Sequence, residues 1–237
     1  MPEPSDVAVV IPAKNESDRV KATVAGAASL PGVDLVVVVD DGSRDDTATV
    51  AEGAGAVVVR HSRTRGKAAA METGAEAVRL LERNDGRVSP RHLLFLDADL
   101  AETAAEAGPL AGPVRAGDAD MTIAVFKDRV KKGGHGFVVG LSGAGIERAT
   151  GWRPAQPLNG QRCLTRSAFE AARPLAPGFG AETALTIDLL CHGMRVTEVE
   201  VAMGHRATGG DWRSQLHRAR QFTDVARALL ARRGRRC

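Results

Sequence analysis

Short, almost purely apolar runs alternate with helical segments along the first half of the chain, and this pattern restricts the fold more than any other feature. Because a continuous apolar strand is buried on both faces, the pattern indicates a mostly parallel sheet that helices cover on both sides. The expected strands are 7–13, 34–41, 56–60, 92–99 and 119–126. The expected helices follow Ser17–Asp18 and Asp45–Asp46 and fill 66–83. The predicted fold class is therefore α/β, with a central sheet flanked by helices.

Composition restricts the class of protein. Of the 237 residues, 43% are hydrophobic, which is ample for a packed core. The net charge is +3. The sequence contains no basic stripe with interleaved aromatic residues, which is the pattern that would indicate nucleic-acid binding. The N-terminus lacks the basic and apolar regions of a signal peptide, and no apolar run reaches the roughly 18 residues of a membrane span. We therefore expect a soluble protein without a nucleic-acid partner.

The cysteines and the basic C-terminus bear on the cellular location. Cys163, Cys191 and Cys237 are odd in number and lack metal-ligand spacing, which indicates a reducing cytoplasm. The final sequence, ARRGRRC, has two interpretations. It is either a solvated helix end whose cations interact favourably with the helix dipole, or a contact with nucleic acid or with anionic lipid at the inner face of a membrane.

Polar residues follow four of the expected strands at the point where each strand ends. They are Asn15 and Glu16, Asp40 and Asp41, Arg60 and His61, and Asp97 and Asp99. Ligands of parallel sheets bind at the carboxyl ends of the strands. Four strand ends that direct polar groups at one edge are the strongest evidence for a ligand site in this sequence.

The sequence LDADL at 96–100 predicts a metal site. On a strand, Asp97 and Asp99 point to the same face, and Ala98 keeps the opposite face small. Two hard carboxylate ligands suit Mg²⁺ or Mn²⁺, which would also bind substrate phosphates. The alternative is a strand followed by an Asx turn or a helix cap at Asp99.

Seven motifs in order resemble a family 2 glycosyltransferase of the GT-A fold, over nearly the whole chain. They are VVIPAKNE (9–16), VVDDGSRDDTA (38–48), RTRGKAAAMETG (63–74), FLDADL (95–100), NGQRCLTRSAF (159–169), GFGAETALTID (178–188) and GHRATGGDW (204–212). The set is most similar to glucosyl-phosphoglycerate synthases and to the catalytic domains of polyprenyl-phosphate sugar transferases. The resemblance implies one Rossmann-like GT-A domain over 1–237. In it, 1–126 would bind the nucleotide sugar, and 127–237 would bind the acceptor and add the C-terminal helix.

The second half is expected to contain a mobile loop that leads into a short helix over 127–151, and a final helix over about 212–232.

The resemblance implies a set of site residues. Donor binding would involve Pro12, Ala13, Asn15, Glu16, Asp40, Asp41, Gly66, Lys67, Asp97, Ala98, Gln161 and Arg162. Asp97 and Asp99 would bind the metal, with His205 as a further ligand. Structural alternatives remain open: a turn at Asp41 with helix caps at Asp45 and Asp46, a basic loop at Lys67, and a surface pair at Gln161 and Arg162.

An inverting transferase also needs a carboxylate that accepts the proton of the acceptor hydroxyl. Glu182 and Asp188 are the candidates. Six residues apart on one helix, they lie about 120° apart and cannot both point into one pocket unless the segment bends. We favour Glu182, for proton transfer or for binding the donor sugar, and keep Asp188 as the rival base.

The predicted function is a metal-dependent, inverting transfer of a sugar from a UDP- or GDP-linked donor to a hydroxyl or phosphate acceptor. The acceptor is expected to be phosphorylated or lipid-linked, and a homodimer is left open. The alternatives are a sugar-phosphate nucleotidyltransferase and a catalytically silent nucleotide-sugar-binding module.

Overall fold

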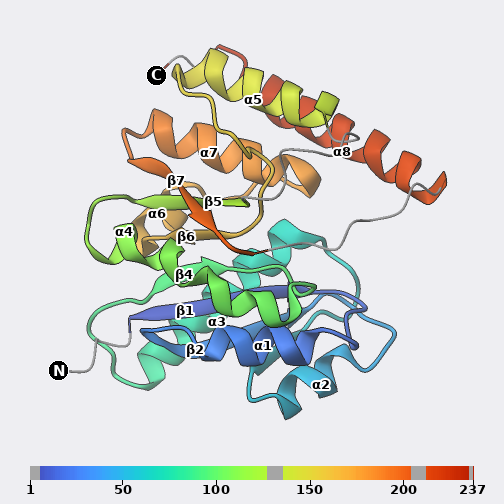
Figure 1. Cartoon of the computed structure of the whole chain (residues 1–237), viewed down its shortest axis with the longest axis vertical. Helices are drawn as coiled ribbons and strands as arrows, with labels where there is room; N and C mark the ends of the chain where they lie inside the picture. The colour runs from blue at the N-terminus through green and yellow to red at the C-terminus, as the bar shows by residue number, and fades with distance from the viewer. Residues whose placement is uncertain (1–5, 127–135, 204–211, 235–236) are drawn as a thin grey trace.

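The computed structural model describes residues 6–126, 136–203, 212–234 and 237, with only the backbone described for 212–220 (Figure 1). Within these residues, seven strands form one sheet in the order β3-β2-β1-β4-β6-β5-β7. β6 runs antiparallel to both of its neighbours, and the other strand pairs are parallel. The strands are β1 (Val7–Ala13), β2 (Val33–Asp40), β3 (Val57–Arg60), β4 (His92–Phe95), β5 (Met121–Phe126), β6 (Arg162–Leu164) and β7 (Val196–Val201).

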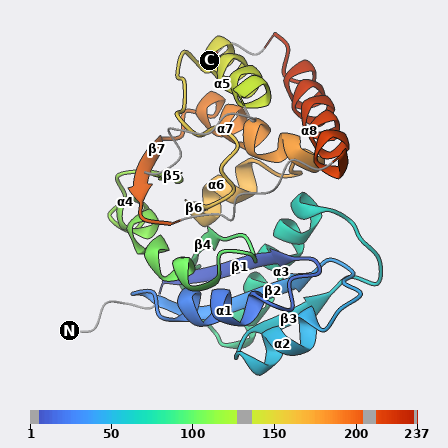
Figure 2. The same cartoon turned by 45° about the vertical axis from the view of Figure 1, so that its right-hand side comes forward.

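Helices cover both faces of this sheet because the side chains of its central strands alternate between two apolar cores. Val9 of β1 faces a core shared with α1 and η1, whereas Val10 faces a core shared with α3, α6 and α7. α5 and α8 pack outside α7, at the end of the molecule away from α2 (Figures 1 and 2). The helices are α1 (Val20–Ala28), α2 (Thr47–Gly53), α3 (Lys67–Asn84), α4 (Ala111–Arg115), α5 (Gly136–Thr150), α6 (Arg166–Ala171), α7 (Ala181–Cys191) and α8 (Trp212–Leu230), with 3₁₀ helices η1 (Ala101–Leu110) and η3 (Gly178–Gly180).

The structure confirms the predicted α/β class and corrects three details. β3 lies at the edge of the sheet, so Val57 is 40% exposed and the strand is not buried on both faces. β4 ends at Phe95, so the two aspartates of LDADL lie in the turn beyond the strand rather than on it. α5 has 15 residues and is longer than the short helix expected there.

A disulfide joins Cys191, at the end of α7, to Cys237, a pairing that the sequence spacing does not indicate. Cys163 is a buried free thiol, and burial raises its pKa to about 12. In the part of the chain described, no helix combines the length and the hydropathy needed to cross a membrane.

Candidate active site

The loops after β1 and β2 lie side by side because the two strands are parallel neighbours. We call the edge of the sheet where β1, β2, β3 and β4 end the carboxyl rim. Asn15 joins the two loops: its N–H donates to Ser43 Oγ, and its Oδ1 accepts the N–H of Arg44, both at 2.9 Å. Its φ of +54° is a left-handed conformation that asparagine tolerates. The side chain of Asn15 therefore shapes the rim.

Asp40, the last residue of β2, is fully buried and bonded within the protein. Its carboxylate accepts the N–H of Ser43 at 2.9 Å and the Nε–H of Arg60 at 3.1 Å. The bond from Ser43 closes the turn over Asp41 that the sequence offers as the structural alternative, whereas Asp46 makes no side-chain cap to α2. Donor binding by Asp40 stays a prediction.

Asp41 fixes the loop that leads into α3. Its carboxylate accepts the backbone N–H groups of Arg65 and Gly66, each at 2.8 Å, and lies 2.7 Å from His61 Nδ1. Burial raises the pKa of Asp41, but the hydrogen bonds from His61, Arg65 and Gly66 outweigh it and hold that pKa below its ordinary value. Asp41 thus positions the start of α3, where Lys67 lies, and its direct contact with nucleotide stays a prediction.

Four side chains from separate parts of the chain meet at the rim. Lys67 Nζ lies 2.7 Å from Asp97 Oδ1 and 3.2 Å from Glu182 Oε1. Gln161 Nε2 donates to the other oxygen of Asp97 at 3.0 Å. Burial lowers the pKa of Lys67, but Asp97 and Glu182 outweigh it and raise that pKa above its ordinary value. A protonated lysine therefore lies between two carboxylates, with 33% of its side chain still exposed.

Gly160 is a site residue that the sequence interpretation did not identify. A Cβ atom on it would lie 2.3 Å from Lys67 Nζ and 3.2 Å from Asp97 Oδ1. Only glycine lets the backbone lie against this ion pair without displacing it. The Asn159–Gly160 turn, with Asn159 Oδ1 accepting the N–H of Gln161 at 3.0 Å, was the available signal.

Negative charge gathers on the same rim. Burial raises the pKa of Glu16, and the carboxylate of Asp99 raises it further. Asp45 and Asp97 act in the same direction, while Arg19 opposes them. Asp99, Asp45 and Asp97 therefore lie close enough to Glu16 to act on its charge, and carboxylates are ligands that suit a divalent cation. Among the described residues, however, no three His, Cys, Asp or Glu side chains are grouped so that they could hold a metal ion by themselves.

Thr23 of α1 holds the turn that carries the two aspartates of LDADL. The buried Thr23 hydroxyl donates to the carbonyl of Ala98 and accepts the N–H of Ala101, both at 2.9 Å. Ala101 has a φ of +49°, a conformation that alanine rarely adopts. The sequence gives no signal for this role, because it depends on the packing of α1 beside the turn.

Arg162 lies beneath the site rather than in it, which corrects the prediction that it grips a sugar or a phosphate. It is 1% exposed, and its guanidinium donates to the backbone carbonyls of Pro157 and Asn159, both at 2.9 Å, and of Glu182 at 3.1 Å. Burial lowers its pKa to about 10, against the opposing charge of Glu182. Arg162 thus ties the segment before β6 to the start of α7.

Asp188 is not brought to Lys67 and Asp97. It forms a two-bond ion pair with Arg232, in which Nε lies 2.8 Å from Oδ1 and the second contact joins Nη2 to Oδ2. α7 is an unbroken helix, so the angle of about 120° between Glu182 and Asp188 is preserved. Glu182 therefore points to the rim, and Asp188 points to the residues after α8.

The remaining predicted residues fall at the rim or outside the description. Pro12 and Ala13 are the last residues of β1, paired with the end of β2. Gly66, at a φ of +94°, immediately precedes α3. His205, predicted as a metal ligand, lies outside the described residues.

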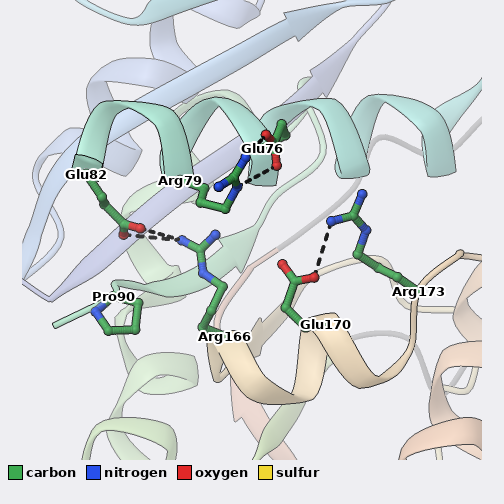
Figure 3. Close-up of a pocket in the computed structure, with 7 residues that line it drawn as sticks. All are labelled: Glu76, Arg79, Glu82, Pro90, Arg166, Glu170 and Arg173. Atoms are coloured by element: carbon green, nitrogen blue, oxygen red, sulfur yellow. Dashed lines mark hydrogen bonds and ion pairs between the residues drawn. The ribbon is translucent and has the colours of Figure 1, made fainter. Parts of the chain in front are cut away.

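A separate cavity of about 370 Å³ lies between α3 and α6 (Figure 3). Its charged side chains pair with one another: Arg166 with Glu82, Arg79 with Glu76, and Arg173 with Glu170. Glu82 lies about 20 Å along α3 from Lys67, at a rise of about 1.5 Å per residue. This cavity is therefore remote from the carboxyl rim and has balanced charge.

Comparison with known proteins identifies the family. A model described as "Glycosyl transferase family 2" matches residues 8–168. The chain belongs to this family. The mixed sheet is the GT-A fold that the motifs predict, and the expected enzyme class, a glycosyltransferase, agrees with the family.

Individual relatives of this family 2 chain cover most of its length. Glycosyltransferase AglJ of Haloferax volcanii is 28% identical over 89% of this chain and 67% of its own length. Glucosyl-3-phosphoglycerate synthase of Mycolicibacterium paratuberculosis is 30% identical over 77% of this chain and 59% of its own. The chain therefore spans about three fifths to two thirds of these relatives.

A solved structure extends the comparison to three dimensions. The crystal structure of glucosyl-3-phosphoglycerate synthase from Mycobacterium tuberculosis, in complex with Mn²⁺, UDP and phosphoglyceric acid, is 25% identical. It matches with a TM-score of 0.73, over 97% of this chain and 78% of that one.

Proposed function

We propose that this chain is a metal-dependent, inverting glycosyltransferase that moves a sugar from a UDP-linked donor to a phosphorylated acceptor. The observation that carries the proposal is the meeting of Lys67, Asp97 and Glu182, from three distant parts of the sequence, on the carboxyl rim. A cation between two carboxylates at a ligand-binding edge suits a diphosphate group on one side and a reacting hydroxyl on the other.

A divalent cation fits the acidic side of this rim. Asp99 would hold the ion together with Asp97, and His205 is a further candidate ligand. The carboxylates already raise the pKa of Glu16, so a cation would relieve their repulsion. When bound, Mg²⁺ or Mn²⁺ supplies charge neutralisation for the departing diphosphate.

The residues of the chain account for the other tasks. Lys67 lies at the first position of α3, where the positive end of the helix dipole favours phosphate oxygens. Glu182 lies in the first turn of α7, and we assign to it the proton of the acceptor hydroxyl. Gln161 orients Asp97 through the hydrogen bond to its Oδ2.

The choice of donor and acceptor is supported by the mycobacterial enzyme, whose structure contains UDP, Mn²⁺ and phosphoglyceric acid. The present chain covers 59% of the length of one such synthase. The UDP-linked donor and the phosphorylated acceptor are therefore proposed for this chain by analogy with that enzyme.

Calorimetry with UDP and GDP, in Mn²⁺ and in excess chelator, tests the proposal. We expect UDP to bind only when the metal is present. At a free UDP concentration a hundred times the dissociation constant, binding should add about 2.7 kcal/mol to the unfolding free energy. Asp99→Ala should abolish the metal-dependent binding of UDP. Asp18→Ala is the control, because Asp18 is an exposed carboxylate before α1, and this variant should bind UDP as the wild type does.

In the calorimetry, equal UDP binding with and without metal would refute the metal site. A product assay with UDP-glucose and phosphoglycerate then tests transfer. Metal-dependent binding without transfer to any phosphorylated acceptor would refute the proposed acceptor class.

A further inference from the structure

The last helix and the residues after it carry a local excess of positive charge. Residues 212–237 contain eight arginines and a single acidic residue, Asp224, so their side chains carry a net +7. The whole chain carries +3, which leaves the first 211 residues at −4. Such a separation directs one end of a protein toward an anionic partner.

α5 and α8 lie side by side at this end (Figures 1 and 2). Each helix carries a row of apolar residues that is followed by an arginine. Spacings of three and four residues place each stripe on one side of its helix. The stripe on α5 is Phe137, Leu141, Ala144 and Arg148. The stripe on α8 is Phe222, Ala226 and Leu230, and Arg233 follows in the turn after the helix. We call the surface formed by these eight residues the α5–α8 seam.

The seam has an aromatic end, an apolar middle and a basic end. Phe137 and Phe222 stack with ring centroids 5.6 Å apart, although Phe137 is 77% exposed. Along the seam lies a groove of about 690 Å³, lined by Leu141, Ala144, Ala226 and Leu230 and by Ile187 of α7. Arg148 and Arg233 border the groove and form no ion pair with any described residue.

Exposed apolar surface is concentrated on this face. Of the six large hydrophobic residues that are exposed in the described part of the chain, three belong to the seam: Phe137, Phe222 and Leu230. The far end of the groove is held in place, because Cys237 is bonded to Cys191 and its N–H donates to the carbonyl of Ala149 at 3.1 Å. The groove is therefore formed before any partner binds.

We propose that the α5–α8 seam docks on a lipid bilayer that contains anionic phospholipids. Phe137, Phe222 and Leu230 enter the boundary between headgroups and acyl chains, and the arginines meet lipid phosphates. This inference goes beyond the proposed transferase activity and does not depend on it.

Two other occupants fit the seam less well. In a two-fold contact with a second copy, Arg148 and Arg233 would face equally basic surfaces, and like charges across an interface are unfavourable. A nucleic acid would neutralise the arginines but would leave the aliphatic groove and Leu230 in water. A bilayer satisfies both the charge and the apolar surface.

Flotation of the full chain with lipid vesicles tests the proposal. We expect it to float with vesicles of phosphatidylcholine and phosphatidylglycerol in equal parts, and not with phosphatidylcholine alone. Arg148→Ala with Arg233→Ala should weaken partitioning about 25-fold, since each basic residue near an anionic surface contributes about five-fold. Phe137→Ser with Phe222→Ser should weaken it at least about ten-fold.

Matched controls lie on other faces. Val88→Ser with Leu80→Ser removes exposed apolar side chains, and Lys21→Ala with Arg83→Ala removes exposed cations. Both pairs should float like the wild type, and thermal unfolding verifies that each variant is folded.

The proposal is overturned if the wild type fails to float, if it floats equally with both vesicles, or if the seam variants float unchanged. A dimer in sedimentation velocity that Phe137→Ser with Phe222→Ser dissolves would assign the seam to a second copy instead, and also overturn it.

Discussion

Neighbouring residues serve different purposes at this site. Gln161 and Arg162 are adjacent and were both predicted to grip the substrate. Because successive side chains of an extended chain point to opposite sides, Gln161 reaches Asp97 while Arg162 enters the interior and bonds to Glu182 and Asn159. The side-chain alternation of a strand, applied to this pair, excludes the joint role.

The two carboxylates of α7 give a sharp prediction, because the structure separates them. Glu182→Gln keeps the shape of the side chain but removes the proposed base. Turnover should fall about 10²–10⁴-fold while donor affinity changes little. Steady-state kinetics and calorimetry on the same preparations measure both quantities.

Asp188→Asn is the control for Glu182→Gln. It breaks the ion pair with Arg232, so it should lower the unfolding free energy by about 1–3 kcal/mol and leave turnover within a few-fold. A large loss of turnover in Asp188→Asn, with near-normal kinetics in Glu182→Gln, would reverse the assignment.

At the scale of elements, the position of α3 decides where Lys67 lies. α3 packs on β1 through Gly74, where an added Cβ would lie 2.3 Å from Val10 Cγ1. This close approach explains a glycine in the middle of a helix, where it otherwise costs about 1 kcal/mol relative to alanine. The helix is thereby held against the sheet, with its first residue at the rim.

Gly74→Ala should move α3 away from β1 and lower the unfolding free energy by about 1–3 kcal/mol, the usual cost of overpacking. It should also weaken UDP binding in Mn²⁺, because Lys67 moves with the helix. Gly53→Ala in α2 is the matched control, since nothing lies within 4 Å of its Cβ position. That variant should be as stable as the wild type or slightly more stable. Equal urea midpoints for the two variants would contradict the packing argument.

The elements that local pattern determines were predicted, and those that depend on distant partners were not. β1 and β2 are dense in valine and α3 has a regular apolar face, so their bounds came out within a residue or two. α5 is rich in glycine and is completed by packing on α7 and α8, which no local pattern reveals. The turn after β4 likewise depends on Thr23, which is more than 70 residues away in sequence.

At the scale of the whole molecule, one sheet joins the two predicted halves. β6 has three residues and comes late in the sequence, yet it lies between β4 and β5. Its insertion brings Gln161 to Asp97, and α7 then brings Glu182 to Lys67. The strand pattern predicted the rim formed by β1 to β4. The second-half residues Gln161 and Glu182 were indicated by the family motifs and not by the strand pattern, because a three-residue strand has no periodicity to read.

Acid should loosen the contact between the loops after β1 and β2. Burial raises the pKa of Asp45, but hydrogen bonds from Thr47 and Ser17 outweigh it and lower that pKa from 3.8 to about 2. A carboxylate whose pKa is lowered by folding stabilises the fold fully at pH values above its pKa in the unfolded chain, which is 3.8 here. This contribution is lost as the pH falls through the folded-state pKa of about 2. Asp45 therefore stabilises the rim at neutral pH and not in strong acid.

Asp45→Asn should accordingly lower the unfolding free energy by about 1 kcal/mol at neutral pH, the scale of a lost hydrogen bond. The difference from the wild type should shrink between about pH 4 and pH 2, where the wild-type carboxylate itself takes up a proton. Urea unfolding across this range measures it, with Asp46→Asn as the control, because Asp46 is exposed and its side chain makes no hydrogen bond to a described residue. If the difference in unfolding free energy between Asp45→Asn and the wild type stays constant down to pH 2, the ionised form of Asp45 does not stabilise the loops.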